Sequence, residues 1–135
     1  MVYPGTTRLI YNRFILSAEP RSHRVEPDIT VVAISGRLTL GSLLQSIESE
    51  IQELIDGGAR KLVLDLTGLN AIDSSGVGTL IICGEHMDRL GGRMRMAGAH
   101  GSVAKIFGTI HINRVIPLDA DLGSACEGFS TGATA

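Results

Sequence analysis

The chain has 135 residues, of which 44% are hydrophobic and 19% charged, and this balance predicts one folded domain rather than a disordered chain. The formal net charge of -2 gives no electrostatic basis for binding nucleic acid or an anionic membrane, so neither is expected as a partner. No run approaches the roughly 18 apolar residues of a membrane span, and the two cysteines, Cys83 and Cys126, suit a reducing compartment, so we expect a soluble, cytoplasmic protein.

Residues 1–20 are predicted to form an N-terminal extension. Arg8 to Leu16 is rich in apolar residues and is compatible with a strand or a short helix, which Pro20 ends. We expect an arm that packs on the domain or on a neighbouring molecule, with disorder as the alternative.

A regular pattern follows the extension. Ser22 to Glu26 is compatible with a short strand, and Glu26-Pro27-Asp28 with a turn, because proline presets the backbone angle and aspartate supplies a local acceptor. Ile29 to Ser35 is rich in β-branched residues and is typical of a buried strand. These two strands are predicted to form a hairpin.

The first helix is predicted after a loop from Gly36 to Gly41. Ser42, with Gln45 three residues later, is typical of a capping box, and Gly57-Gly58 ends the helix. Between these points apolar residues recur at helical spacing, which predicts an amphipathic helix. They are Leu43, Leu44, Ile47, Ile51, Leu54 and Ile55.

A strand, a loop and a second helix are predicted next. The strand runs from Lys61 to Leu66 and the connecting loop from Thr67 to Ile72. The helix runs from Ser75 to Leu90, and Gly91-Gly92 ends it.

The remaining residues predict two strands and two helices. Arg93 to Ala97 is predicted as a strand, and Ser102 as the cap of a third helix. Val115-Ile116 is predicted as a last short strand and Asp119 to Glu127 as a terminal helix, whereas residues 128–135 are predicted to be a flexible tail.

Strands therefore alternate with helices after the opening hairpin. This order predicts a single α/β domain at residues 21–127, with a mixed, mostly parallel sheet of four to five strands and about four helices.

The most informative segment is Asp73-Ser74-Ser75-Gly76, where a loop is predicted to enter a helix. Backbone N–H groups lack partners at a helix start, and the helix dipole is positive there. A serine at this place can cap the helix, or it can carry a phosphate that adds about -1.5 to -2 charge units. Position alone favours capping, and both uses stay open. Asp73 would concentrate negative charge beside a modified serine.

Spacing argues against the catalytic alternatives. A nucleophile elbow requires glycine two residues before the serine, where this chain has Ile72 and Asp73. A dinucleotide loop requires glycine at the position of Ile81, and no phosphate loop ending in Gly-Lys-Ser/Thr is present. The histidines are scattered, and His86 is expected on a helix surface. We expect no catalytic residue, no metal site and no cofactor, and therefore no enzyme.

Four stretches of the chain give it a resemblance to the STAS domain family, in the branch of bacterial anti-sigma factor antagonists. The third of them carries the serine pair. The resemblance covers about residues 22 to 127, and the stretches are Ile29 to Leu38, Leu62 to Leu66, Ile72 to Gly78, and Gly91 to Met96 with Val103 to Phe107.

The resemblance implies a regulatory cycle. The unphosphorylated antagonist binds an anti-sigma factor with a histidine-kinase-like ATPase fold and thereby frees a sigma factor. The anti-sigma factor, acting as a serine kinase with ATP and magnesium of its own, phosphorylates the serine after the motif aspartate, here Ser74. A metal-dependent serine/threonine phosphatase reverses this step. Ser75 is then expected to cap and support the helix. The expected partner-binding residues are Arg37, Thr39, Asp73, Ser74, Ser75 and Gly76.

Two features depart from the family pattern. Many antagonists have Gly-Glu-Leu-Asp where this chain has Gly36-Arg37-Leu38-Thr39, which changes two charges on the partner surface. The N-terminal extension also exceeds what the family domain needs. The alternative hypothesis is a STAS interaction module without a kinase cycle, in a transport or stress-signalling complex. A homodimer is left open.

Overall fold

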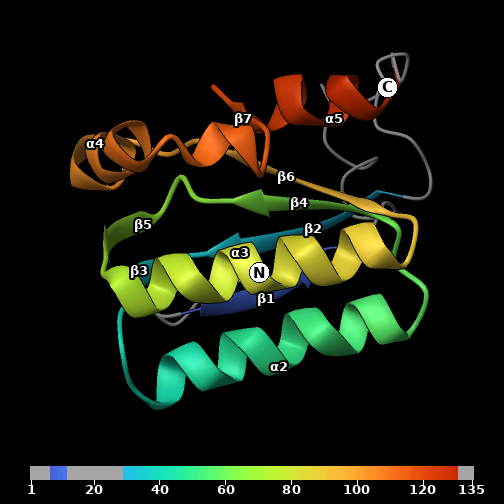
Figure 1. Ribbon diagram of the computed structural model, residues 1–135, viewed down its shortest axis with the longest axis horizontal. Helices are drawn as coiled ribbons and strands as arrows, with labels where there is room; N and C mark the ends of the chain where they lie inside the picture. The colour runs from blue at the N-terminus through green and yellow to red at the C-terminus, as the bar shows by residue number, and fades with distance from the viewer. Residues whose placement is uncertain (1–6, 12–28, 131–135) are drawn as a thin grey trace.

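The computed structural model describes residues 7–11 and 29–130, which form a five-stranded sheet with helices on both faces (Figure 1). The sheet consists of β1 (Thr7–Tyr11), β2 (Ile29–Ile34), β4 (Lys61–Asp65), β6 (Arg93–Ala97) and β7 (Leu118–Asp119). The strands lie in the order β1-β2-β4-β6-β7, with β1 antiparallel to β2 and the other pairs parallel. The predicted α/β class with a mixed, mostly parallel sheet is confirmed.

Four α-helices lie in the described part of the chain. They are α2 (Ser42–Asp56), α3 (Ser74–Arg89), α4 (Gly101–Ile110) and α5 (Leu122–Ser130), and a short 3-10 helix, η1 (Ile112–Arg114), follows α4. The first two agree with the predicted helices to within one residue at each end.

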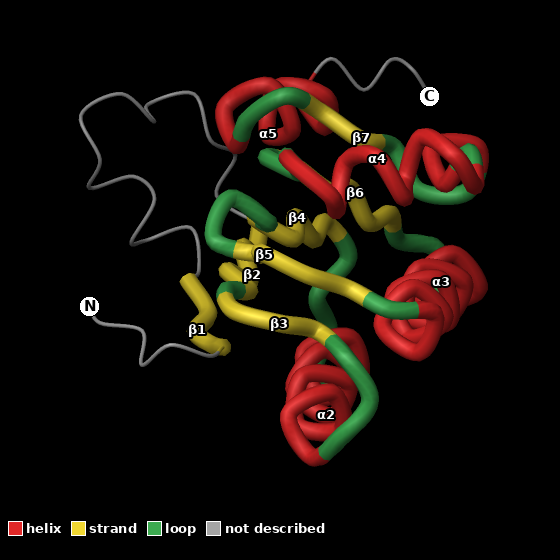
Figure 2. The backbone as a smooth tube through the Cα atoms, turned by 90° about the vertical axis from the view of Figure 1, so that its left-hand side faces the viewer, coloured by secondary structure: helices red, strands yellow, loops and turns green. Residues whose placement is uncertain are grey.

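The sheet has two apolar faces because successive side chains of a strand point to opposite sides. One face packs under α2, α3 and α4, and α5 covers the other (Figure 2). The first face carries Val32, Ile34, Leu62, Leu64, Met94 and Met96. The second carries Ile29, Val31, Val63 and Ala97, which pack against Ala125 and Cys126 of α5.

Two predicted loops are wrong, because each contains a strand. β3 (Gly36–Leu38) and β5 (Leu69–Ile72) pair in parallel and form a separate two-stranded sheet. Strands of three and four residues are too short to show an alternating pattern. β3 buries one side chain, Leu38, and β5 buries the two at its ends, Leu69 and Ile72.

The predicted serine caps are also wrong. Gly41 occupies the N-cap of α2 with a φ of 146°, a backbone angle that side chains rarely adopt, and Ser42 is already helical. His100 occupies the N-cap of α4 without a side-chain cap bond, and Ser102 lies inside that helix. The cap therefore lies one residue before the predicted serine in α2 and two residues before it in α4.

The C-terminal region differs from the prediction in three details. Val115-Ile116 is not a strand, and β7 lies after Pro117 instead. The last helix begins at Leu122 rather than Asp119 and continues to Ser130. Gly128 and Phe129, which were predicted in the flexible tail, are therefore helical.

The antiparallel partner of β2 is β1, which lies within the predicted N-terminal extension. The predicted strand from Ser22 to Glu26 and the turn at Glu26-Pro27-Asp28 lie outside the described residues. The hairpin predicted with that strand therefore stays a prediction.

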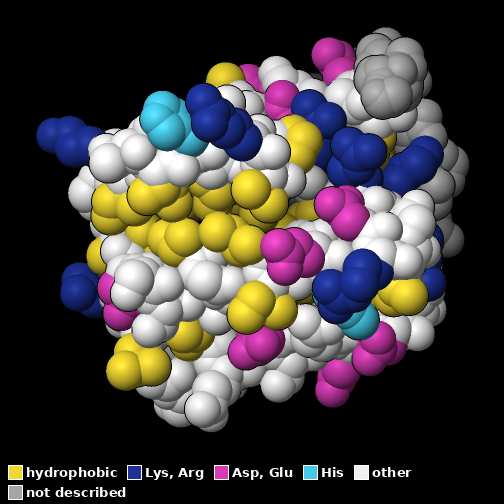
Figure 3. Space-filling model, in the orientation of Figure 1, with side chains coloured by type: hydrophobic (Ala, Val, Ile, Leu, Met, Phe, Trp, Pro, Cys, Tyr) yellow, Lys and Arg dark blue, Asp and Glu magenta, His cyan; other side chains and the backbone are white. Residues whose placement is uncertain are grey.

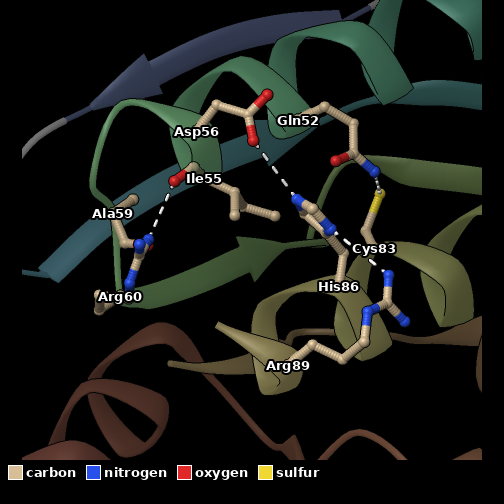
Figure 4. Close-up of polar contacts among 8 residues, drawn as sticks. All are labelled: Gln52, Ile55, Asp56, Ala59, Arg60, Cys83, His86 and Arg89. Carbon is tan, nitrogen blue, oxygen red and sulfur yellow. Dashed lines mark hydrogen bonds and ion pairs between the residues drawn. The ribbon is translucent and has the colours of Figure 1, made fainter. Parts of the chain in front are cut away.

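A polar cluster joins the C-terminal halves of α2 and α3 (Figure 4). The Nε2 atom of His86 lies 3.4 Å from Oδ1 of Asp56, and Arg89 lies 3.5 Å from the other ring nitrogen. Gln52 contacts the sulfur of Cys83 at 3.9 Å. His86 is half-buried between the two helices, so its role here is to connect them.

No helix in the described ranges is long and apolar enough to cross a membrane.

Phe107→Ala is expected to lower the free energy of unfolding by about 3–5 kcal/mol, because Phe107 is among the largest fully buried side chains and its loss leaves a cavity. Chemical denaturation measures this. Ile110→Ala on the same helix is the control and is expected to cost no more than about 1 kcal/mol, because Ile110 is partly exposed. Equal effects of the two changes would contradict this description of the core.

Candidate functional site

The carboxylate of Asp73 organises the start of α3. Asp73 is the N-cap residue, with extended backbone, and its Oδ1 atom accepts a hydrogen bond of 2.9 Å from the Gly76 N–H. This bond satisfies one of the donors that a helix start leaves unpaired. The sequence assigned capping to Ser75, and that assignment is wrong: the aspartate caps, and α3 begins at Ser74.

The same carboxylate also holds the loop that precedes α2. Its Oδ2 atom accepts a hydrogen bond of 3.1 Å from the N–H of Leu40, and the N–H of Asp73 donates to the Leu38 carbonyl at 3.4 Å. Two segments more than thirty residues apart in sequence are therefore joined through one side chain. Figure 2 shows β3 and β5 side by side, each leading into one of these helices.

These hydrogen bonds have an electrostatic consequence. The bonds from the N–H groups of Gly76 and Leu40 lower the pKa of Asp73 from its ordinary value of 3.8. Asp73 is therefore ionised throughout the neutral pH range, and a fixed negative charge lies at the helix start.

Gly76 permits the close contact between α3 and β3. A Cβ atom at Gly76 would collide with the Leu38 carbonyl oxygen and would lie 2.7 Å from Cγ1 of Ile72. Gly76 is buried, so it contributes to the site through its N–H and its lack of a side chain.

Ser74 is the first residue of α3 and is exposed. Its hydroxyl makes no hydrogen bond to any described residue, because the cap is supplied by Asp73. Ser75 is half-buried. The exposed hydroxyl of Ser74 thus lies at the positive end of a 16-residue helix, beside an ionised carboxylate.

The two residues predicted on the partner surface from the preceding loop lie near this helix start. Arg37 is exposed on β3, in register with Ala71 of β5, and Thr39 is half-buried. The structure therefore brings Arg37, Thr39, Asp73, Ser74, Ser75 and Gly76 together at one end of the two-stranded sheet.

Sequence reasoning missed Leu40. Its side chain is 77% exposed, the largest exposure among the large apolar side chains described, and its backbone N–H is bound by Asp73. The sequence feature that could have identified Leu40 is its position in a predicted loop, directly before Gly41 and outside the helical pattern of α2. Leu40 therefore adds an exposed apolar side chain next to the helix start that carries Ser74.

The described residues offer little support for catalysis. They contain no group of three or more His, Cys, Asp or Glu side chains that could hold a metal ion. Burial raises the pKa of Cys83 to about 12 and that of Cys126 to about 11, so both thiols are protonated at neutral pH. His86 lies twelve residues after Ser74 on α3, about 18 Å along the helix axis, too far for a nucleophile–base pair.

The sequence model of the family described as the STAS domain matches residues 21–125, which is more than half of the chain. The chain belongs to the STAS domain family. This confirms the resemblance to the STAS domain family seen in the sequence. Among curated proteins no relative matches this STAS domain.

Solved structures with this fold include anti-sigma factor antagonists. One from Mycobacterium paratuberculosis has a TM-score of 0.71 and 18% identity, and the match covers 95% of this STAS domain chain and 97% of that chain. SpoIIAA of Bacillus in its unphosphorylated form has a TM-score of 0.66 and 22% identity, covering 78% and 91%. Its phosphorylated form has a TM-score of 0.61 and 22% identity, covering 78% and 94%. At these identities the likeness establishes a shared fold.

Asp73→Asn is expected to lower the melting temperature near neutral pH, because an amide oxygen can cap α3 but its NH2 group cannot accept from Leu40. The folded-state pKa of Asp73 lies below 3.8, so its ionisation stabilises the fold above that pH and the benefit is lost as pH falls through the lowered pKa. Thermal unfolding from about pH 7 to about pH 3 should show the difference between the two proteins shrinking in acid. A difference that is constant over this range would contradict the assigned role of the charge.

Proposed function

We propose that this STAS domain is an anti-sigma factor antagonist that binds an anti-sigma factor with kinase activity and is switched off by phosphorylation of Ser74. The observation that carries the proposal is the exposed Ser74 hydroxyl, which the cap at Asp73 leaves without a structural task. Proteins of the same fold include SpoIIAA, an anti-sigma factor antagonist known in unphosphorylated and phosphorylated forms.

The chemistry assigned to the chain is that of a substrate. The Ser74 oxygen takes the γ-phosphoryl group of ATP and gives up its proton, and ADP leaves. The anti-sigma factor supplies ATP and magnesium, and a serine/threonine phosphatase removes the phosphate by hydrolysis. The domain itself catalyses neither step. The cycle takes place in the cytoplasm, where sigma factors act.

The proposed switch is local electrostatics rather than refolding. A phosphate on Ser74 adds about -1.5 to -2 charge units beside the ionised Asp73. The positive end of α3 offsets part of the cost within the domain, so the fold is retained. A partner surface complementary to a small neutral hydroxyl meets both bulk and repulsion, and binding weakens.

We propose that Arg37 and Thr39 determine which anti-sigma factor this surface binds. Arg37 is exposed and positively charged where many antagonists of this family carry an acid. A partner that binds this chain is therefore expected to have a carboxylate or a neutral group opposite Arg37. This would distinguish it from the partners of antagonists that have an acidic residue at this position.

Ser74→Ala is expected to abolish phosphate incorporation when the protein is incubated with its cognate anti-sigma kinase, ATP and magnesium. Intact-mass spectrometry should find one phosphate on the wild-type protein and none on the variant. Ser75→Ala is the matched control and should still accept phosphate, because Ser75 is half-buried behind the exposed serine. Full phosphorylation of Ser74→Ala would refute the assignment.

Ser74→Asp should weaken kinase binding without changing the melting temperature appreciably. The interaction module without a kinase cycle is supported instead if no phosphate is ever detected and the domain co-purifies with a transporter ATPase. The observation that favours this interaction module is the exposed Arg37, which departs from the acidic pattern of many antagonists.

Leu40→Ala is expected to weaken binding of the anti-sigma factor by about tenfold, because a protruding apolar side chain beside Ser74 is available to fill a cavity in the partner. Isothermal titration calorimetry measures the loss. Leu90→Ala removes the same side chain at the far end of α3 and should change the affinity by less than about twofold. If the two variants bind alike, Leu40 lies outside the interface.

A further inference from the structure

A band of apolar side chains lies between α3 and α4 on the face shown in Figure 3. We name it the α3–α4 strip. It consists of Val77 and Ile81 of α3, Ile106 and Ile110 of α4, and Val115 after η1. Val77, Ile81 and Ile106 are partly buried against the core, whereas Ile110 is 43% and Val115 46% exposed.

The strip has a defined floor and a defined end. Val77, Ile81 and Ile106 pack against the same core cluster, and β5 contacts both α3 and α4, so it forms the floor between the two helices. At Gly84 a Cβ atom would lie 3.2 Å from Cγ1 of Ile116, so the segment after η1 closely approaches α3 there. The uncovered part therefore lies along the N-terminal half of α3.

Ser74 lies on the same side of α3 as the strip. Val77 and Ile81 follow it by three and seven residues, and residues at this spacing share one face of a helix. The proposed switch is thus in line with the apolar side chains rather than on the side that faces α2.

The α4 side of the strip and the end of the strip that is far from Ser74 differ in charge. Residues 98–118 contain Lys105, Arg114 and two histidines but no Asp or Glu, and both basic side chains are exposed. On α3, exposed Glu85 and Asp88 follow Ile81 by four and seven residues, so they lie in line with the strip beyond the end that is far from Ser74. Figure 3 shows basic and histidine side chains above the apolar band, on the α4 side, and carboxylates at the right-hand end of the band.

We propose that the α3–α4 strip is a docking surface for an amphipathic helix of the anti-sigma factor, with carboxylates along the edge of that helix that lies on α4. The inference rests on the proposed function, because it takes Ser74 as the switch. Apolar anchors at helical spacing fill the strip, and Lys105 and Arg114 meet the acidic edge.

This arrangement explains why a phosphate at Ser74 would act on the occupant directly. A helix with carboxylates enters a field of positive charge from α4 and η1 when Ser74 is unmodified. A phosphate at the end of the strip opposes that field and repels the same carboxylates. A flat anionic membrane fits less well, because it would bring lipid headgroups against Glu85 and Asp88 at the end of the strip far from Ser74.

The test is the affinity of the purified kinase-type anti-sigma factor that phosphorylates Ser74, measured by calorimetry. The double variant Ile110→Ser, Val115→Ser should bind at least about tenfold more weakly than the wild type. The control Ile82→Ser, Leu90→Ser removes side chains of similar exposure, 51% and 43%, elsewhere on the surface, and should bind within about twofold of the wild type. Circular dichroism and thermal unfolding confirm that both variants are folded.

A second pair of variants tests the charge. Lys105→Glu with Arg114→Glu should weaken binding by about tenfold at low salt, with the difference shrinking as salt screens it. Arg60→Glu with Arg89→Glu reverses two exposed charges away from the strip, Arg60 after α2 and Arg89 beside His86 on the side of α3 toward α2, and should change the affinity by less than about twofold.

The outcomes separate this inference from the proposed function. If the wild type binds the kinase and Ser74 is phosphorylated, yet the strip and charge variants bind as the wild type does, only the strip is refuted. If the wild type neither binds nor is phosphorylated by any such kinase, both proposals fall. Loss of a wild-type homodimer in the strip variant, or binding of the wild type to phosphatidylglycerol vesicles that the variant loses, would identify a different occupant and overturn the inference.

Discussion

The arrangement of this domain's site depends on one carboxylate that accepts hydrogen bonds from two parts of the chain. Oδ1 of Asp73 receives the N–H of Gly76 and Oδ2 receives the N–H of Leu40. Because the aspartate does the capping, the serine that follows it is left exposed and unpaired among the described residues. The same bonds keep the carboxylate ionised. The local structure therefore provides both an accessible hydroxyl and a permanent negative charge next to it.

The longest elements of the fold could be predicted from sequence because their apolar residues recur often enough to define a period. α2 and α3 are examples, and so are the buried strands β2, β4 and β6. β3 and β5 could not be predicted, since three or four residues define no period and their pairing depends on tertiary contacts. The serine caps failed for another reason: Gly41 and Asp73 precede those serines and determine where the backbone turns into the helix.

The residues of the candidate site could be predicted from the sequence, but the structural role of each residue could not. The Asp-Ser-Ser-Gly motif pointed to a helix start, and the structure assigns the cap to Asp73 and the close contact to Gly76. Leu40 could not be identified, because exposure depends on where a loop lies in three dimensions. The same holds for Ile110 and Val115, whose apolar character alone predicts burial.

The separate pairing of β3 with β5 has a consequence for how such domains diverge. These strands position Arg37 and the helix start through backbone hydrogen bonds and a few buried side chains, while the large core under α2 and α3 determines most of the stability. Exposed residues on this small sheet can change without disturbing that core. The binding specificity of such a surface can therefore change by substitution of exposed residues alone, with the fold retained.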